Sequence, residues 1–329
     1  MPRRIGRHAL FSGLAVLLLI LMYLSLAIGY RLYSPAEIWR AVTAFDGSEA
    51  HVVIRDLRLP RALMAPLVGA ALGIAGVLVQ TLSRNRIASP DTLGLNAGAA
   101  FAVVMASGLF GVASLPGLSL AAASGALATS LLVFGLAAAA GGISPLRIVL
   151  VGVTFAGLFD SFVNVVLTVN ETMLDQLLFW LAGFFADRKL SLALNGLPFV
   201  LVGGGIAFYL ARSLDILQTD DSTARGLGVP LGVVRGLSFV AVALLSGASV
   251  AMAGPVLFVG LVVPHAARAL VGLEHRLQIV AAALVGAVYT TLADIVARFV
   301  IFPREAPVGA VTAIVGGCLL LLLLRRRAA

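Results

Sequence analysis

Two arginines near residue 60 are the first candidates for chemistry, because guanidinium groups bind anionic partners. Arg58 and Arg61 flank Leu59-Pro60 and lie three residues apart, so both side chains share one face of a helix. Pro60 is typical of the first turn of a helix. A helix amino terminus is partly positive, so two arginines there are unfavourable unless an anion lies close by. The alternative is that both side chains snorkel to lipid headgroups.

Further charges fall within apolar segments of the chain. Asp294 and Arg298 are four residues apart, which predicts an i,i+4 ion pair on one helix. Charges inside membrane spans otherwise mark functional sites. Asp160 has no obvious partner within its own segment, and we favour a polar contact with another helix over a proton relay.

An aromatic stripe occupies the same segment as Asp160. Phe155, Phe159 and Phe162 recur at i, i+4 and i+7, which places them on one helix face. Such a stripe is usual for packing or for contact with lipid. The other interpretation is that these rings line a substrate path.

Several catalytic and metal-binding signatures are missing from the sequence. A nucleotide-binding P-loop needs Gly-Lys followed by Ser or Thr, but the only lysine, Lys189, follows Arg188. The sequence has no G-x-S-x-G element, and its four histidines form no H-E-x-x-H pair. Cys318 is the single cysteine, so no intrachain disulfide can form. We therefore expect neither an enzyme nor a metal site.

The elements that carry these residues are expected to be membrane-spanning helices. Of the 329 residues, 60% are hydrophobic and 12% are charged, whereas soluble domains are about 25% charged. The net charge of +8 comes from residues between apolar runs, so it does not indicate a nucleic-acid-binding domain. The sequence predicts an all-α, single-domain membrane protein over 1–329, with ten spans near 10–30, 62–82, 92–111, 118–140, 147–169, 193–211, 234–254, 256–272, 277–299 and 307–324.

The basic residues also predict an orientation in the membrane. Ten spans place both termini on one side, and the arginines at both ends of the chain assign that side to the cytoplasm. The first apolar segment resembles a signal peptide, but it is long and lacks a convincing cleavage site, so we expect an uncleaved span. On this topology the polar stretch 212–235 faces the cytoplasm. Gly69, Gly73 and Gly76 predict close packing of the second span.

Several stretches resemble the FecCD/BtuC-like family of permease subunits of ABC importers, which carry ferric siderophores, ferric citrate, ferric enterobactin, haem or vitamin B12. The sequence departs from the usual pattern at Arg86-Ile87 and at 304–307. The matching stretches are RLPRALMAPLVGAALGIAGVLVQTLSRN (58–85), ASPDTLGLNAGAAFAVV (88–104), ARGLGV (224–229), GPVLFVGLVVPHAARALVG (254–272), HR (275–276), ADIVAR (293–298) and PVGAVTA (307–313).

The resemblance implies a type II importer permease with several partners. These are a second permease subunit in a homo- or heterodimer, two cytoplasmic ATPases that hold the ATP and magnesium, and a periplasmic binding protein. It implies that the binding protein docks on Arg58, Arg61 and Arg298. It also implies a cytoplasmic gate at Ser144 and Pro145 before the fifth span. The ATPase-coupling residues would be Asp221, Ala224, Arg225, Gly226, Leu227 and Gly228, within the coupling loop 212–235.

The predicted function is ATP-driven import of a ferric siderophore across the bacterial cytoplasmic membrane by alternating access. Phe155, Phe159 and Phe162 would line the path, and the chain itself would bind no cofactor. Import of haem or a corrinoid is the alternative substrate assignment. A proton-coupled secondary transporter that uses Asp160 and Asp294 is the alternative from another class.

Overall fold

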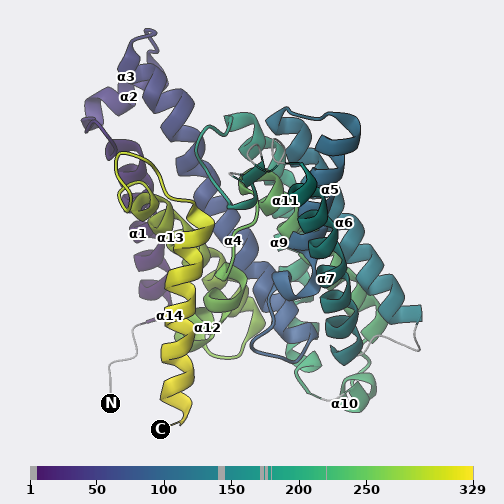
Figure 1. Cartoon of the computed structure of the whole chain (residues 1–329). Coiled ribbons are helices and arrows are strands. Elements are labelled where there is room, and N and C mark those ends of the chain that lie inside the picture. Colours follow the sequence, from purple (N-terminus) through teal and green to yellow (C-terminus); the bar gives the residue numbers. More distant parts are fainter. Residues whose placement is uncertain are drawn as a thin grey trace.

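The computed structural model describes residues 6–139, 145–170, 174, 177–178, 180–219 and 221–328, and the described part is built from helices. Seven of these helices are long and apolar enough to cross a bilayer. Three shorter apolar helices bring the total in the described part to the predicted ten. The prediction of an all-α polytopic membrane protein is confirmed (Figure 1).

The ten apolar helices begin and end within a few residues of the predicted spans, apart from the carboxyl end of the sixth. The segments between them include a 3-10 turn, Pro90–Leu93, and a short helix, α10 (Asp221–Gly226). The apolar helices are α1 (Arg7–Ala27), α4 (Leu59–Leu82), α5 (Leu95–Phe110), α6 (Leu115–Ala139), α7 (Pro145–Val169), α9 (Leu190–Leu217), α11 (Leu231–Ala253), α12 (Val259–Val271), α13 (His275–Ala297) and α14 (Val308–Ala328).

The second span begins earlier than the sequence predicted. α3 (Glu49–Val52) and a π-helical turn (Val53–Arg58) run into α4 without a break, so one helix extends over Glu49–Leu82. Arg58 and Arg61 therefore lie inside a helix and not at its amino terminus. Pro60 does lie in the first turn of α4, as predicted, but the π-helical turn before it already has helical backbone, so no free helix end lies there.

The two ends of the bundle differ. α2 (Pro35–Thr43) and α3 project from one end, beside the loop that joins α13 to α14 (Figure 1). The start of α1, the end of α14 and the short α10 lie at the other end (Figure 1). We call these the α2 end and the α10 end.

α4 is the central helix and packs against α9, α11, α12 and α13. A Cβ at Gly69 would lie 2.1 Å from the carbonyl oxygen of Gly286 on α13, and a Cβ at Gly76 would lie 2.0 Å from that of Gly260 on α12. The backbones of these helices are therefore in direct contact, as the small residues predicted. Gly73 makes the same kind of approach to Ala282.

This crossing gives a first prediction. Gly286→Ala should destabilise the fold by about 1–3 kcal/mol, because its new methyl group would meet the Gly69 carbonyl oxygen at 2.1 Å. Gly135→Ala on α6 is the matched control, since a Cβ there meets nothing within 4 Å. Thermal unfolding in detergent should show a lower melting temperature for Gly286→Ala only. Equal melting temperatures for both variants would contradict the close crossing.

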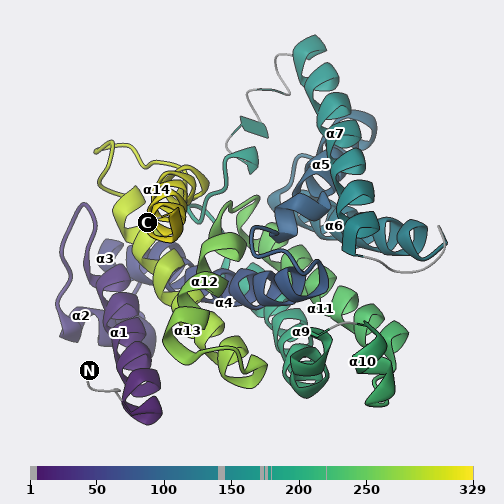
Figure 2. The ribbon, with the colours of Figure 1, turned by 90° about the horizontal axis from the view of Figure 1, so that it is seen from below.

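α5, α6 and α7 form a group at one side of the bundle, where they pack on one another and are joined to the rest mainly through α11 (Figure 2). α7 is the outermost of these helices, and most of its side chains are at least partly exposed. Its surroundings in a membrane therefore have to be lipid, water or another protein.

Candidate functional site

Arg61 lies in a buried ion-pair network at the α2 end. Its Nη2 lies 2.7 Å from Oδ1 of Asp294, and its Nη1 lies 2.7 Å from Oε2 of Glu305. Asp294 is fully buried and also pairs with Arg298 at 2.5 Å, as the i,i+4 spacing predicted. Arg58, Arg61, Asp294, Arg298 and Glu305 are hereafter the arginine network.

The other two arginines of the network hold the end of α1. Arg58 donates from Nη1 to the carbonyl oxygens of Leu26 and Ala27, at 2.8 and 2.9 Å. Arg298 donates to the carbonyl and hydroxyl oxygens of Ser25, both at 2.7 Å. The last carbonyls of a helix carry partial negative charge, so cations are favourable there.

These contacts correct the electrostatic premise drawn from the sequence. Arg61 and Arg298 pair with carboxylates of this chain, whereas Arg58 donates to backbone carbonyl oxygens, including that of Arg31. All three side chains are buried. The three guanidinium groups and two carboxylates give the network a net charge of +1, and Arg58 is the arginine without a carboxylate partner among the described residues. The predicted docking of a partner on these three arginines stays a prediction, and such a partner would have to reach them past Glu305, whose side chain is 35% exposed.

Other arginines at the α2 end are exposed. Arg31 precedes α2, Arg40 lies in the last turn of α2, and Arg304 lies in the loop before α14. Arg55 is also exposed and lies over the ring of Phe45 at 4.8 Å. These arginines alternate with the exposed carboxylates of Asp46, Glu49 and Asp56, so this end presents charges of both signs to an approaching protein.

At the α10 end, the predicted coupling loop 212–235 is not a loop throughout. α9 continues to Leu217, α10 covers Asp221–Gly226, and α11 begins at Leu231. The extension of α9 to Leu217 was not predicted, because the polar residues at its end resemble loop residues.

Asp221 anchors α10 to two long helices. Its Oδ1 lies 2.6 Å from Nη2 of Arg84, just after α4, and 2.8 Å from Nη2 of Arg235 on α11. Burial raises the pKa of Asp221, but the two arginines outweigh it and hold the pKa below its ordinary value of 3.8. The ion pairs therefore stabilise the fold at neutral pH. That contribution is lost only as the pH falls from about 3.8 through the lowered pKa of Asp221.

The remaining predicted coupling residues form the tip of this segment. Ala224 is buried, whereas Arg225, Gly226, Leu227 and Gly228 are exposed, with Leu227 64% exposed. Gly228 has a φ of +77°, so it suits the turn that follows α10. An exposed leucine in the turn directly after an anchored short helix is the kind of projection that a partner protein can hold in a pocket.

The rings of the phenylalanine stripe on α7 contact one another and Phe101, and their place along a substrate path stays a prediction. Phe159 stacks on Phe101 of α5 with ring centroids 5.0 Å apart, and Phe155 lies 5.7 Å from Phe159. Phe162 is 51% exposed, although its ring also lies 5.9 Å from Phe101. Of the two predicted gate residues, Pro145 is the first residue of α7 and Ser144 lies outside the described residues.

A polar stripe on α7 was missed by the sequence reasoning. Asp160 and Asn164 are exposed and four residues apart, and three exposed hydroxyl residues lie along the same side of the helix. The hydroxyls are satisfied by carbonyls four residues earlier, at 2.6–2.8 Å. The sequence signal that could have predicted this stripe was the recurrence of polar residues at intervals of three and four. The hydroxyl residues are Thr154, Ser161 and Thr168.

This stripe distinguishes α7 from a helix that faces lipid. Exposed polar groups in a membrane span are costly unless they face water or another protein. α1 is exposed as well, but along its membrane-spanning part the exposed side chains are mostly apolar. The exposed face of α7 is therefore the best candidate for a water-filled path or a subunit contact.

Three comparisons with known proteins agree along nearly the whole chain. The family model of the FecCD transport family matches residues 17–326. The chain is 38% identical to YfiZ of Bacillus subtilis (strain 168), described as a probable siderophore transport system permease, over 96% of this chain and 95% of that protein. It is 38% identical to FepD of Escherichia coli (strain K12), a ferric enterobactin transport system permease, over 98% of this chain and 97% of that protein.

A solved structure is similar as well. It is described as an inward-facing conformation of a metal-chelate type ABC transporter, and it matches with a TM-score of 0.86 at 33% identity. The match covers 96% of this chain and 99% of the other. The likeness therefore extends over the helical bundle. The residues matched by the family model include the arginine network and α10.

Proposed function

The chain belongs to the FecCD transport family and is the membrane-spanning subunit of an ABC importer, and we propose that its cargo is a ferric siderophore. The observation that carries this is the near full-length match to permeases of siderophore and ferric enterobactin systems and to a metal-chelate transporter of the same fold. Haem and cobalamin are the competing cargoes.

The proposal divides the work between this chain and its partners. A subunit of such an importer acts with ATPase and substrate-binding components. We propose that two ATPases hold the ATP and magnesium, and that this chain binds no cofactor of its own and hydrolyses no ATP. The exposed tip of α10, anchored by Asp221, would transmit movement from the ATPases to α9 and α11.

The proposed orientation places the α10 end in the cytoplasm of a bacterial cell and the α2 end outside. In support, the start of α1, the end of α14 and α10 lie at one end of the bundle (Figure 1). The arginines of both chain termini then obey the positive-inside rule. The exposed arginines at the α2 end would attract an acidic binding protein, whose carboxylates would reach the arginine network by displacing Glu305.

The proposed path runs along the polar stripe of α7, between this chain and a second permease subunit. Alternation between outward- and inward-open states would expose this stripe to each side in turn. Asp294, which a proton-coupled transporter would need free, is bound between Arg61 and Arg298. That arrangement favours ATP-driven transport over the proton-coupled alternative.

Reconstitution tests the proposed function. Proteoliposomes that contain the permease with its ATPase and binding protein should take up a ferric siderophore only with ATP, and dissipation of the proton gradient should have no effect. Haem and cobalamin serve as competing cargoes in the same assay. Uptake of either of them in place of the siderophore, or uptake driven by the proton gradient alone, would overturn the proposal.

A second prediction concerns the stripe on α7. Asn164→Leu and Asp160→Leu should lower uptake by roughly tenfold or more, equivalent to at least about 1.4 kcal/mol in the barrier, because they remove polar groups from the path. Asp160→Asn should be mild, since the amide keeps the polarity. The apolar control is Val165→Leu, which is exposed on the same helix. Normal uptake by both leucine variants would show that the path lies elsewhere.

A further inference from the structure

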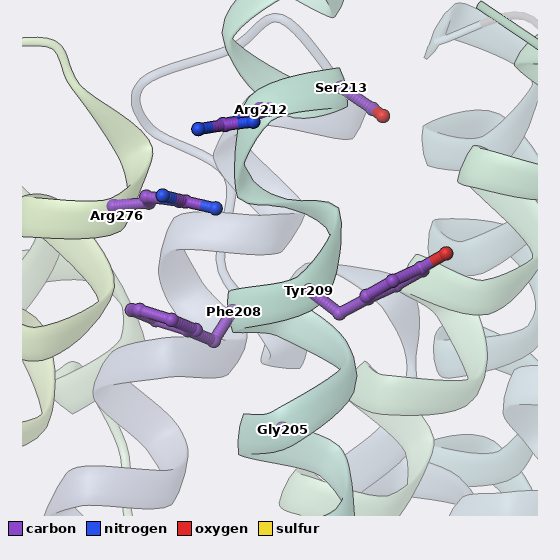
Figure 3. Close-up of a pocket in the computed structure, with 6 residues that line it drawn as sticks. All are labelled: Gly205, Phe208, Tyr209, Arg212, Ser213 and Arg276. Carbon is purple, nitrogen blue, oxygen red and sulfur yellow. The ribbon is translucent and has the colours of Figure 1, made fainter.

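An open pocket of about 540 Å³ lies near the α10 end, between α9 and α13, away from the sites already described. Figure 3 shows Arg212 of α9 and Arg276 of α13 on the same side of α9, with the ring of Phe208 on the side away from the α10 end. Tyr209 and Ser213 extend to the other side of α9 (Figure 3). The pocket is therefore rich in positive charge at one end and apolar at the other.

The two guanidinium groups are not neutralised by the described part of the chain. Neither Arg212 nor Arg276 has a described carboxylate within 4.0 Å, and the Nε of Arg276 is buried without a hydrogen-bond partner there. The carboxylate of Glu274, two residues before Arg276, lies 4.0 Å from Arg7. Asp215 is engaged by His275. Two adjacent cations of this kind favour an anionic ligand.

The walls of the pocket are held in place. Asp215 on α9 accepts a hydrogen bond from the backbone N–H of His275 at 2.8 Å, and Gln218 donates to the carbonyl oxygen of Leu273 at 3.2 Å. These bonds join the end of α9 to the start of α13. Arg276 also lies over the ring of Phe208 at 5.7 Å. The arginines are thus presented by a fixed pair of helix ends.

The surface next to the arginines suits a hydrocarbon chain. Leu201, Gly205, Phe208 and Arg212 recur at spacings of four, three and four residues, so they share one face of α9. Leu201 is 64% exposed and Phe208 is 45% exposed, and a Cβ at Gly205 would meet nothing within 4 Å. An exposed apolar face of α9 therefore leads from the middle of the span to the pocket with the two arginines.

We propose that this pocket binds the phosphate headgroup of an acidic phospholipid, with an acyl chain lying along the Leu201–Phe208 face of α9. Basic pockets between membrane helices are suited to such headgroups, because phosphate accepts several hydrogen bonds from arginine. The assignment of this lipid to the cytoplasmic leaflet rests on the proposed orientation. Since α9 leads directly into α10, bound lipid would also stiffen the segment that meets the ATPase.

The test uses the purified permease with phosphatidylglycerol and phosphatidylcholine. It needs neither cargo nor ATP, so a negative result would leave the proposed transport function untouched. Native mass spectrometry should show preferential retention of phosphatidylglycerol. The affinity of the double variant Arg212→Gln/Arg276→Gln for phosphatidylglycerol should be about thirtyfold lower than that of the wild type, which corresponds to about 2 kcal/mol. Gly205→Leu should lower the affinity too, because the new side chain would fill part of the pocket. Arg212→Lys/Arg276→Lys should retain part of the affinity.

The matched control is Arg40→Gln/Arg86→Gln, which removes two exposed arginines elsewhere and should retain the lipid. A melting curve for each variant establishes that it is folded. Equal retention of the two lipids by the wild-type protein, or unchanged retention in the double glutamine variant, would overturn the proposal. Displacement of the lipid by millimolar inorganic phosphate alone would also overturn it, because the site would then take a soluble anion.

Discussion

Asp294→Asn is expected to destabilise the permease by about 3–5 kcal/mol, the largest effect on stability that we expect from any single polar substitution. The Asp294 carboxylate is fully buried and pairs with both Arg61 and Arg298. Asparagine keeps the shape but removes the charge, so two buried guanidinium groups would lose their shared anion. Thermal unfolding in detergent and the yield of folded protein measure the effect.

Glu305→Gln provides the comparison within the same network. Glu305 pairs with Arg61 alone and is partly exposed, so its loss should cost no more than about 1 kcal/mol. Asp294→Asn should therefore melt well below Glu305→Gln. If the two variants melt together, or if Asp294→Asn melts like the wild type, the buried ion pairs do not hold α1, α4 and α13 together.

The same network determines how the docking of a binding protein can be tested. Arg61→Glu would place a third carboxylate beside Asp294 and Glu305, so a loss of uptake would not by itself show a loss of docking. Reversal of the exposed arginines Arg40 and Arg304 disturbs no described ion pair. Restored binding after a matching glutamate-to-arginine change in the binding protein would identify which set of arginines is touched.

The sequence was sufficient to predict the positions of the apolar helices and contacts between residues of the same helix. Hydropathy located the ten apolar helices, and the spacing of Asp294 and Arg298 predicted their ion pair. The glycines of α4 predicted a close crossing, although not which helices they meet.

Contacts between distant segments could not be predicted. Arg61 meets Asp294 and Glu305 across more than 230 residues, and Arg58 reaches the last carbonyls of α1. Nothing local in the sequence encodes these pairings, so the arginines seemed to lack anions. On α7 the sequence predicted the aromatic stripe but not that Phe159 and Phe162 meet Phe101 of α5.

Leu227→Glu is expected to abolish ATP-driven uptake while the permease stays folded. Leu227 is 64% exposed at the tip of the α10 segment, so the substitution buries no charge in the isolated chain. In complex with an ATPase, the same carboxylate would enter a protein interface without a partner, which costs several kcal/mol. Co-purification with the ATPase and ATP-dependent uptake in proteoliposomes measure the two consequences.

Leu273→Glu is the control, because it adds the same charge to an exposed leucine at the α10 end but in the turn between α12 and α13. It should retain ATPase association. Asp221→Asn should give an intermediate loss, since α10 remains present but is no longer held by charged pairs to Arg84 and Arg235. The order expected is therefore Leu227→Glu most impaired, then Asp221→Asn, then Leu273→Glu. Full ATPase association by Leu227→Glu would place the coupling contact outside α10.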